Sequence, residues 1–384
     1  MRNIKYLILT SAFFVFVSCA GMDTNYGISA RTAFNISNGL APQIISPYAG
    51  IDWQNYGQYK AALHTHTTNS DGRNTLSEVI EAHYEKGFDI LAITDHNRVT
   101  SCWVRARNGI TLERFNAIAL GEGRDGRGML SIPYTNEQSR SRHDFNSFFA
   151  DYNNPIFSTL RGSLRRTERR GGISFLNHPG RYTGGLAGGV EGENASNDIQ
   201  IIRKYVDLFM EFPSCVGMEI VNRRDGHSVS DRILWDNILA QTMPQGRFVW
   251  GFANDDSHRN SDIGYSFNVF VMPENTLENF RYAMQGGRFF AAARAARREL
   301  GSDFMGTGPV PVIVNIETDN SSMSITINAE NYSRIDWISN GRVIADGNTI
   351  KLNAQRNNRL GSYVRANIIG PGGIVFTQPF GIIW

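Results

Sequence analysis

Most histidines of this 384-residue chain stand at or just after the ends of short apolar runs. His64 and His66 are two positions apart, so on an extended strand, whose side chains alternate between two faces, both imidazoles point to the same side. Asp71, Glu137 and Asp256 occupy similar positions. The histidines in question are His64, His66, His96, His143, His178 and His258. This mixed nitrogen and oxygen donor set suits Zn, Mn or Fe better than Ca or Mg, which prefer oxygen ligands.

For any single histidine, a hydrogen-bonded structural imidazole is the simpler interpretation. Six histidines at the ends of separate runs favour a shared site, because chance placement would scatter them into helices and loops, as it does His83 and His227. The three carboxylates strengthen this interpretation. The sequence therefore predicts a metal centre built from several strand ends.

Seven apolar runs alternate for the most part with helical patterns, and together they would position these residues. The runs are too short for helices and look like strands buried on both faces, as in a parallel sheet. They cover residues 59–66, 88–96, 129–137, 172–178, 216–222, 248–256 and 265–272. Helical spacing occurs over residues 75–87, 198–210 and 230–243, the first with a Thr-x-x-Glu capping box. Such alternation predicts an α/β barrel or a doubly wound sheet, whose active sites lie at the carboxyl ends of the strands.

The pattern changes near residue 306, where short strand-like runs separated by turn residues replace the helices. Six such strands are expected, over residues 310–318, 323–329, 334–339, 349–352, 363–369 and 374–384. We expect a barrel domain over residues 53–300 and a small all-β sandwich over residues 306–384.

The N-terminus reads as a removable leader. Arg2 and Lys5 precede an apolar run over residues 6–17, which is too short to span a bilayer but long enough for a signal peptide core. The run ends before Cys19, which resembles the acylated cysteine of bacterial lipoproteins; an ordinary secretory signal is the alternative. The sequence predicts a signal peptide over residues 1–18, lipidation at Cys19, a tether over residues 19–52, and an extracytoplasmic, lipid-anchored protein in the periplasm or at the cell surface.

The charge balance argues against bulk nucleic-acid binding. The chain has 38 Lys and Arg against 36 Asp and Glu, and loss of the two basic leader residues leaves 36 against 36. The only membrane contact expected is through the lipid anchor.

Four motifs resemble those of the PHP (polymerase and histidinol phosphatase) superfamily, in the family's order and with similar spacing: residues 63–72 (LHTHTTNSDG), 93–96 (ITDH), 177–179 (NHP) and 256–258 (DSH). The resemblance covers about residues 55–300 and is strongest to extracytoplasmic and lipoprotein members with a C-terminal β-domain. It implies a distorted seven-stranded (β/α)7 barrel that holds two or three divalent ions.

The resemblance also implies which residues hold each ion. His64, His66, Glu137 and Asp256 would bind the first ion. Glu137 would bridge to a second, held by His143 and His178. Asp71, His96 and His258 would bind a third; position 71 is Asp where some members have His.

These ligands predict hydrolysis of a small-molecule phosphomonoester or phosphodiester by a metal-bridging hydroxide, with Glu137 and Asp256 as the catalytic carboxylates. Arg98, Arg181 and Arg259 follow ligand motifs and could hold phosphate oxygens, or could simply face solvent. Glu219 ends a strand and has either a structural role or a supporting one beside the ligands. Hydrolysis of a carboxylic ester or amide on the same barrel, and a non-catalytic surface binding lipoprotein, remain alternatives.

Overall fold

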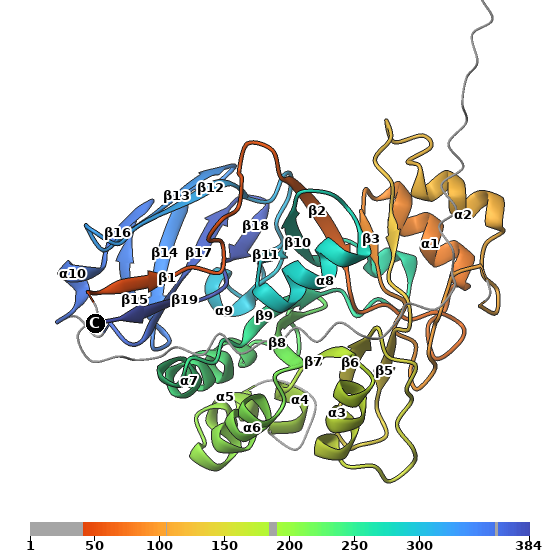
Figure 1. The fold of residues 1–384 in the computed structure, drawn as a ribbon, viewed down its shortest axis with the longest axis horizontal. Coiled ribbons are helices and arrows are strands. Elements are labelled where there is room, and N and C mark those ends of the chain that lie inside the picture. The colour runs from red at the N-terminus through yellow and green to blue at the C-terminus, as the bar shows by residue number, and fades with distance from the viewer. Residues whose placement is uncertain (1–40, 105, 184–189, 358–359) are drawn as a thin grey trace, which may run out of the picture.

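The computed structural model describes residues 41–104, 106–183, 190–357 and 360–384. Figure 1 shows the C-terminal strands at one end of the molecule and the first two helices at the other. The helices are α1 (Leu76–Glu85), α2 (Leu112–Ala119), α3 (Leu160–Arg169), α4 (Gly180–Thr183), α5 (Val190–Ser196), α6 (Ile199–Glu211), α7 (Asp231–Thr242), α8 (Leu277–Gly286), α9 (Arg297–Leu300) and α10 (Leu352–Gln355), with 3₁₀ turns η1 (Met243–Gln245) and η2 (Asn260–Asp262). In these ranges no helix has the length and apolar character that a membrane crossing needs. The expected signal peptide and Cys19 lie outside the described residues.

Two groups of parallel strands form the barrel. The first is β2 (Gly57–Ala62), β3 (Ile90–Leu91) and β4 (Leu130–Ser131), and the second is β7 (Ile173–Leu176), β8 (Cys215–Asn222) and β9 (Trp250–Asn254). An isolated bridge from Thr65 to Ser257 joins the two groups beyond the ends of β2 and β9, and a second bridge, from His96 to Glu137, links the chain after β3 to the strand that contains Glu137. Because these bridges replace a continuous hydrogen-bonded ladder, the barrel is distorted, as expected, and its carboxyl ends converge.

Three antiparallel strands complete the barrel and depart from the uniformly parallel sheet that the runs suggested. β10 (Ser266–Met272) pairs antiparallel with β2, and β6 (Phe145–Phe148) lies antiparallel between β5 (Asn136–Gln138) and β7. The run predicted as one strand over residues 129–137 splits into β4 and β5. Pro133 has no N–H group to donate to a strand hydrogen bond, and Tyr134 has a positive φ of 51°. The chain therefore turns between β4 and β5.

The predicted helices occur nearly where expected, as α1, α6 and α7. Thr75 caps α1, and the reciprocal bonds between Thr75 and Glu78 form the predicted capping box. Asp198 caps α6 by accepting from the backbone N–H groups of Gln200 and Ile201.

The C-terminal region is a two-layered β-structure, as predicted. One layer is β12 (Val312–Asp319), β13 (Ser324–Glu330) and β16 (Thr349–Lys351); the other contains β14 (Arg334–Ser339), β15 (Arg342–Asp346), β17 (Tyr363–Gly370), β18 (Gly373–Phe376) and β19 (Phe380–Ile383). Ile325 and Ile327 of the first layer share a buried core with Trp337 and Val364 of the second. β15 had not been predicted, and the last predicted strand divides into β18 and β19.

This region continues the barrel sheet. β18 pairs antiparallel with β11 (Phe289–Ala293), so one eleven-stranded sheet runs from the C-terminal region into the barrel. The predicted tether over residues 19–52 also needs correction at its C-terminal end. β1 (Gln43–Ile45) pairs with β19, and the apolar Ile44, Tyr48 and Ile51 are buried. Burying these side chains favours order over a loose tether from residue 43 onward.

Candidate metal centre

Eight of the nine predicted ligands meet at the carboxyl ends of the barrel strands. They come from six segments of the chain. These segments meet because neighbouring parallel strands end at the same edge of the sheet. His64 and His66 follow β2, Asp71 lies in the loop that follows, His96 follows β3, Glu137 lies in β5, His178 follows β7, and Asp256 and His258 follow β9.

The deepest donor group surrounds Glu137 and Asp256. Oε2 of Glu137 lies 3.3 Å from Nε2 of His64 and 3.3 Å from Nε2 of His66. Oδ1 of Asp256 lies 3.4 Å and 3.1 Å from the same two nitrogens. All four side chains are buried, so two imidazoles and two carboxylates face one point away from water.

A second group shares Glu137 but differs from the predicted set. Nε2 of His178 lies 3.6 Å from Oε1 of Glu137 and 4.0 Å from Oδ2 of Asp144. His143, predicted as a ligand here, turns away: its Nδ1 is bonded to the carbonyl oxygen of Asp144 and its Nε2 to the Tyr205 hydroxyl. The structure thus offers the neighbouring Asp144 in place of His143, because both ring nitrogens of His143 already have partners.

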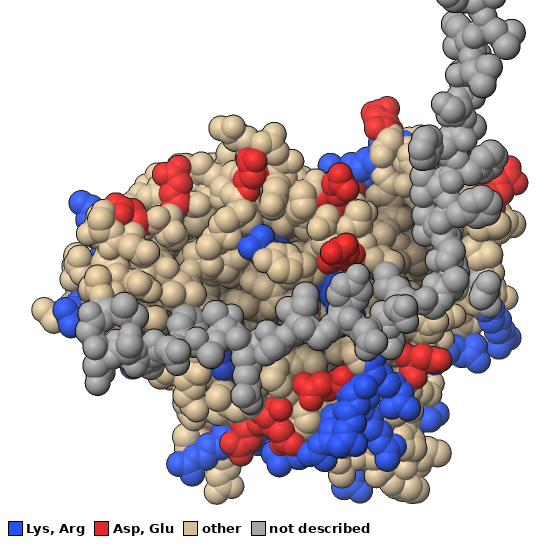
Figure 2. Space-filling model, in the orientation of Figure 1, with Lys and Arg blue, Asp and Glu red and all other residues tan. Residues whose placement is uncertain are grey.

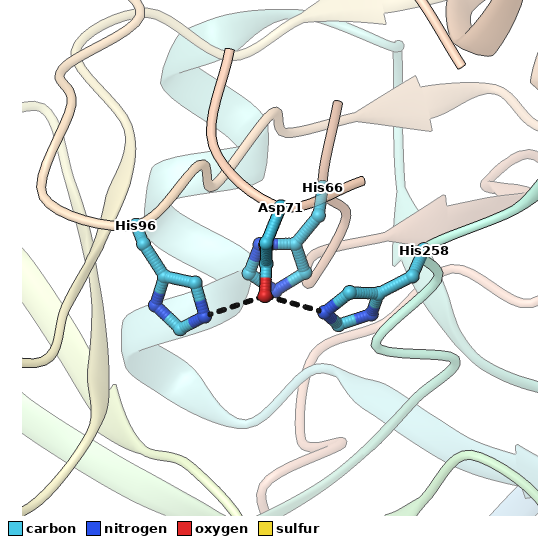
Figure 3. Close-up of side chains that lie close together, drawn as sticks. All are labelled: His66, Asp71, His96 and His258. Carbon is cyan, nitrogen blue, oxygen red and sulfur yellow. Dashed lines mark hydrogen bonds and ion pairs between the residues drawn. The ribbon is translucent and has the colours of Figure 1, made fainter. Parts of the chain in front are cut away.

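The third group consists of His66, Asp71, His96 and His258, with the Asp71 carboxylate between the rings of His96 and His258 (Figure 3). Oδ2 of Asp71 lies 3.2 Å from Nε2 of His258 and 3.5 Å from Nε2 of His96, and its Oδ1 lies 3.4 Å from Nδ1 of His66. The Asp71 side chain is 51% exposed, whereas those of His64 and His66 are fully buried. Solvent therefore reaches the centre from the side of the third group.

Two buried nitrogens support the fit of this donor set to metal ions. Nε2 of His64 and Nε2 of His66 face carboxylate oxygens at 3.1–3.4 Å but form no well-aligned hydrogen bond with them. A buried polar atom without a partner carries a cost that a bound cation would remove. Histidine and carboxylate donors in overlapping groups fit several divalent ions.

The charges of the centre shift its pKa values in opposite directions. Burial lowers the pKa of His66, but the nearby Asp256 and Glu137 carboxylates outweigh it and raise the pKa to about 9. Burial raises the pKa of Glu137, but the charge of His64 and the close approach of the His178, His64 and His66 rings bring it well below its usual range. Bonds from His258 and His96 lower the pKa of Asp71. Without metal, the centre thus favours charged carboxylates beside protonated imidazoles.

Buried side chains behind the ligands hold them in place. Glu219, fully buried in β8, accepts from Nδ1 of His64 at 2.8 Å and from the backbone N–H of His178 at 2.8 Å. Asn177 donates to Oε1 of Glu137 at 2.6 Å. Such partners fix the ring orientation and tautomer of metal-binding histidines. Glu219 was expected to have either a structural role or a role in supporting the ligands, and its contacts with His64 and His178 favour the second role.

The three predicted substrate arginines do not contact the ligands. Arg98, Arg181 and Arg259 are exposed, and in the described structure no bond joins their guanidinium groups to the ligands. Arg223, which sequence reasoning missed, does reach the centre. Its Nε donates to Oδ2 of Asp256 at 3.0 Å, and its Nη2 lies 3.3 Å from Nδ1 of His258.

The backbone fixes where Arg223 points. Its N–H donates to the carbonyl oxygen of Asn254 at 2.8 Å, its carbonyl accepts from the Ser266 hydroxyl at 2.7 Å, and its φ is 56°. Its side chain is 45% exposed, so the guanidinium extends from the buried ligands towards the solvent-exposed side of the centre, the mouth of the barrel. No sequence motif marks this position; only the pairing of β8 with β9 reveals it.

Comparison with known proteins gives partial matches. A family model described as the PHP domain matches residues 62–154. DNA polymerase/3′-5′ exonuclease PolX of Bacillus subtilis is 43% identical over 58 residues, which are 15% of this chain and 10% of that protein. The chain therefore spans about a tenth of the length of that relative.

Two solved structures align with much of the chain at low identity and with TM-scores below 0.5. A two-domain protein of Bacteroides vulgatus, described as containing a predicted PHP-like metal-dependent phosphoesterase, is 16% identical with a TM-score of 0.48, over 86% of this chain and 88% of that one. An amidohydrolase of Chromobacterium violaceum is 16% identical with a TM-score of 0.36, over 60% of this chain and 96% of that one.

Proposed function

We propose that this chain is a metal-dependent phosphoesterase that hydrolyses small phosphomonoesters or phosphodiesters at the mouth of its barrel. The observation that carries the proposal is the placement of Glu137. One of its oxygens faces His64 and His66, and the other faces His178. A carboxylate shared by two donor groups is the arrangement that two-metal hydrolases use. The PHP-domain match over residues 62–154 supports the same activity.

The chain's own residues would prepare the centre for this chemistry. Two or three divalent ions of the Zn, Mn or Fe class, when bound, would lower the pKa of a coordinated water and neutralise charge on the phosphoryl group. Glu219 accepts the Nδ1 proton of His64 and so presents the Nε2 lone pair to the centre. Asn177 holds one oxygen of Glu137. These bonds orient the ligands before substrate arrives.

Arg223 favours phosphoryl over carbonyl substrates. Its Nε donates to Asp256 and its Nη2 approaches His258, but each Nη carries two N–H groups and the side chain is 45% exposed, so N–H groups remain for a substrate at the mouth. A guanidinium matches two oxygens of a phosphate in a bidentate geometry, whereas a neutral ester or amide offers no matching charge. We therefore rank phosphoester hydrolysis above hydrolysis of carboxylic esters or amides.

We also propose that the protein is an extracytoplasmic bacterial lipoprotein in the periplasm or at the cell surface. The apolar run over residues 6–17 before Cys19 supports this location. The anchor would leave the barrel outside the cytoplasm, with a small phosphoester as its substrate.

The test is Glu137→Gln, which keeps the size of the side chain but removes the charge shared by two donor groups. We expect loss of bound metal and a fall in turnover of more than about 100-fold, beyond what loss of an outer partner costs. Metal analysis, thermal unfolding, and hydrolysis of p-nitrophenyl phosphate, bis(p-nitrophenyl) phosphate and p-nitrophenyl acetate would measure this.

The matched control is Glu211→Gln on α6, which loses only surface pairs with Arg161 and Arg165 and should keep metal and activity. A folded Glu137→Gln that retains metal and full turnover would contradict the proposal. Activity confined to the acetate ester would favour the carboxylic ester alternative.

A further inference from the structure

The loop between β6 and α3 exposes two adjacent apolar side chains. Ile156 is 67% exposed and Phe157 is 94% exposed, the largest exposure among the bulky apolar residues of the described chain. Phe157 has a φ of 66°, a left-handed conformation that is unfavourable for a bulky residue. The backbone thus holds the phenyl ring away from the protein, where no packing explains it.

Beside this loop, α3 presents a basic outer face. The helix buries Leu160 and Leu164 against the barrel. The exposed arginines on and just after the helix are Arg161, Arg165, Arg166, Arg169 and Arg170. Figure 2 shows Lys and Arg side chains gathered over α3. A hollow of about 290 Å³ is lined by Ile156, Phe157 and Arg166 together, so the apolar loop and the basic face form one surface.

Much of this positive charge is not neutralised within the protein. Arg161 and Arg165 share one carboxylate, that of Glu211. Arg166 and Arg169 have no ion pair within the described chain. The surface therefore carries excess positive charge next to exposed apolar groups.

The start of this loop is hydrogen-bonded to residues that lie next to two of the metal-centre side chains. The side-chain amide of Asn153 donates to the carbonyl oxygen of Asn97, the residue after His96. The Asn136 amide donates to the carbonyl oxygen of Tyr152 at 3.4 Å, and Asn136 directly precedes Glu137. These two bonds tie the start of the loop that carries Ile156 and Phe157 to residues adjacent to His96 and Glu137.

We propose that Ile156, Phe157 and the exposed arginines of α3 dock the protein onto an anionic phospholipid bilayer and bring the mouth of the barrel to the bilayer surface. Exposed apolar groups beside Arg or Lys are the chemistry of interfacial binding: the apolar groups enter the headgroup region and the cations meet anionic lipid. If the proposed function also holds, the substrate class is a phosphoester presented at the membrane surface.

Two further observations select a bilayer over other partners. Between the predicted anchor at Cys19 and residue 41, where the described structure begins, the chain has 21 residues, which can span up to about 75 Å, enough for the body to lie on the membrane. A nucleic acid would meet an anchored chain whose 36 basic residues are balanced by 36 acidic ones once the leader is lost.

The experiment places an environment-sensitive fluorophore at Pro155→Cys in the full-length chain, with a second labelled chain at Val343→Cys, an exposed site on β15. Each is reconstituted into vesicles of phosphatidylcholine with or without phosphatidylglycerol. On anionic vesicles, the label at 155 should shift to the blue and be quenched by spin-labelled lipid, while the label at 343 should not. Because neither readout involves hydrolysis, failure of docking and failure of the proposed function are distinguishable.

Substitutions then test which residues dock. Arg166→Gln and Arg169→Gln should each lower the ratio of docked to undocked molecules about fivefold, since each cation near an anionic surface is worth about that factor. Phe157→Ser should abolish quenching, whereas Arg342→Gln and Leu120→Ser, exposed elsewhere, should change nothing. The proposal is overturned if the label at 155 stays in water on anionic vesicles, if neutral vesicles give the same shift, if a soluble oligonucleotide gives it, or if it appears without lipid as protein concentration rises.

Discussion

Glu219 is the most highly connected side chain behind the metal centre, and its removal tests how the ligands are held. Its Oε1 accepts from Nδ1 of His64 at 2.8 Å and from Nδ2 of Asn254 at 2.9 Å. Its Oε2 accepts from the backbone N–H of His178 at 2.8 Å and from Nδ2 of Asn222 at 3.0 Å. All four partners donate, so both oxygens must be acceptors.

In Glu219→Gln, one acceptor becomes an NH₂ group that faces two donors whichever way the amide turns. If the nitrogen replaces Oε2, Asn222 can rotate to accept, but the N–H of His178 cannot, and one buried donor loses its bond at a cost of about 1–3 kcal/mol. If it replaces Oε1, His64 must move its proton to Nε2, the atom that faces the ligands. We therefore expect destabilisation of about 1–3 kcal/mol and a 10–100-fold loss of metal affinity, or about 1.4–2.7 kcal/mol.

The assays are denaturant unfolding of the metal-free protein and calorimetric titration with Zn²⁺ and Mn²⁺. A matched control is Asp236→Asn, which removes another buried carboxylate, held by Arg365 and Tyr363 away from the centre. It should lower stability but leave metal affinity unchanged. Wild-type metal affinity in a folded Glu219→Gln would refute the argument that this carboxylate sets the tautomer of His64.

Three further predictions follow from the same geometry. Arg223→Gln should raise KM for phosphoesters and weaken binding of inorganic phosphate. The control is Arg224→Gln, which removes a guanidinium that stacks on Tyr265 and should change neither quantity. Equal effects of the two substitutions in phosphate titrations would contradict a phosphate-binding role for Arg223. Because the pKa of His66 is raised to about 9, its stabilising contribution to the metal-free protein is complete below pH 6.5 and is lost as the pH rises through 9. Metal binding near pH 7 should therefore release protons, and the metal affinity should rise towards pH 9. Calorimetry in buffers of different ionisation enthalpy would measure the protons released. Metal binding without proton release would disprove this prediction. Cys19→Ser should release the protein from membranes of its native host, and a wild type that fractionates as unacylated would rule out the anchor.

The ligand cluster was largely predictable because it depends on two local rules. Side chains alternate along a strand, which places His64 and His66 on one side, and parallel strands end at one edge, which brings His178 and Asp256 to them. Neither rule needs knowledge of distant contacts. Eight predicted ligands accordingly lie together.

The exceptions depend on contacts between distant parts of the chain. His143 and Asp144 are adjacent, and the pattern cannot decide which enters the centre. The choice follows from a left-handed turn at Arg142, with a φ of 57°, and from the Tyr205 hydroxyl on α6, which takes the His143 ring. Arg223 was missed for the same reason, since only the β8–β9 pairing brings it to Asp256.

Asp255 and Asp256 show how far a spacing argument reaches. Asp256 and His258 are two positions apart, a spacing that on an extended strand places both side chains on one side, and Asp256 faces His64 and His66. Asp255 points the other way and accepts from the backbone N–H groups of Gly264, Tyr265 and Ser266 at 2.5–2.9 Å. Burial raises its pKa to about 7 even so. Spacing could choose the inward carboxylate, but only the fold shows that its neighbour fixes the loop before β10, so the two adjacent acids have separate roles.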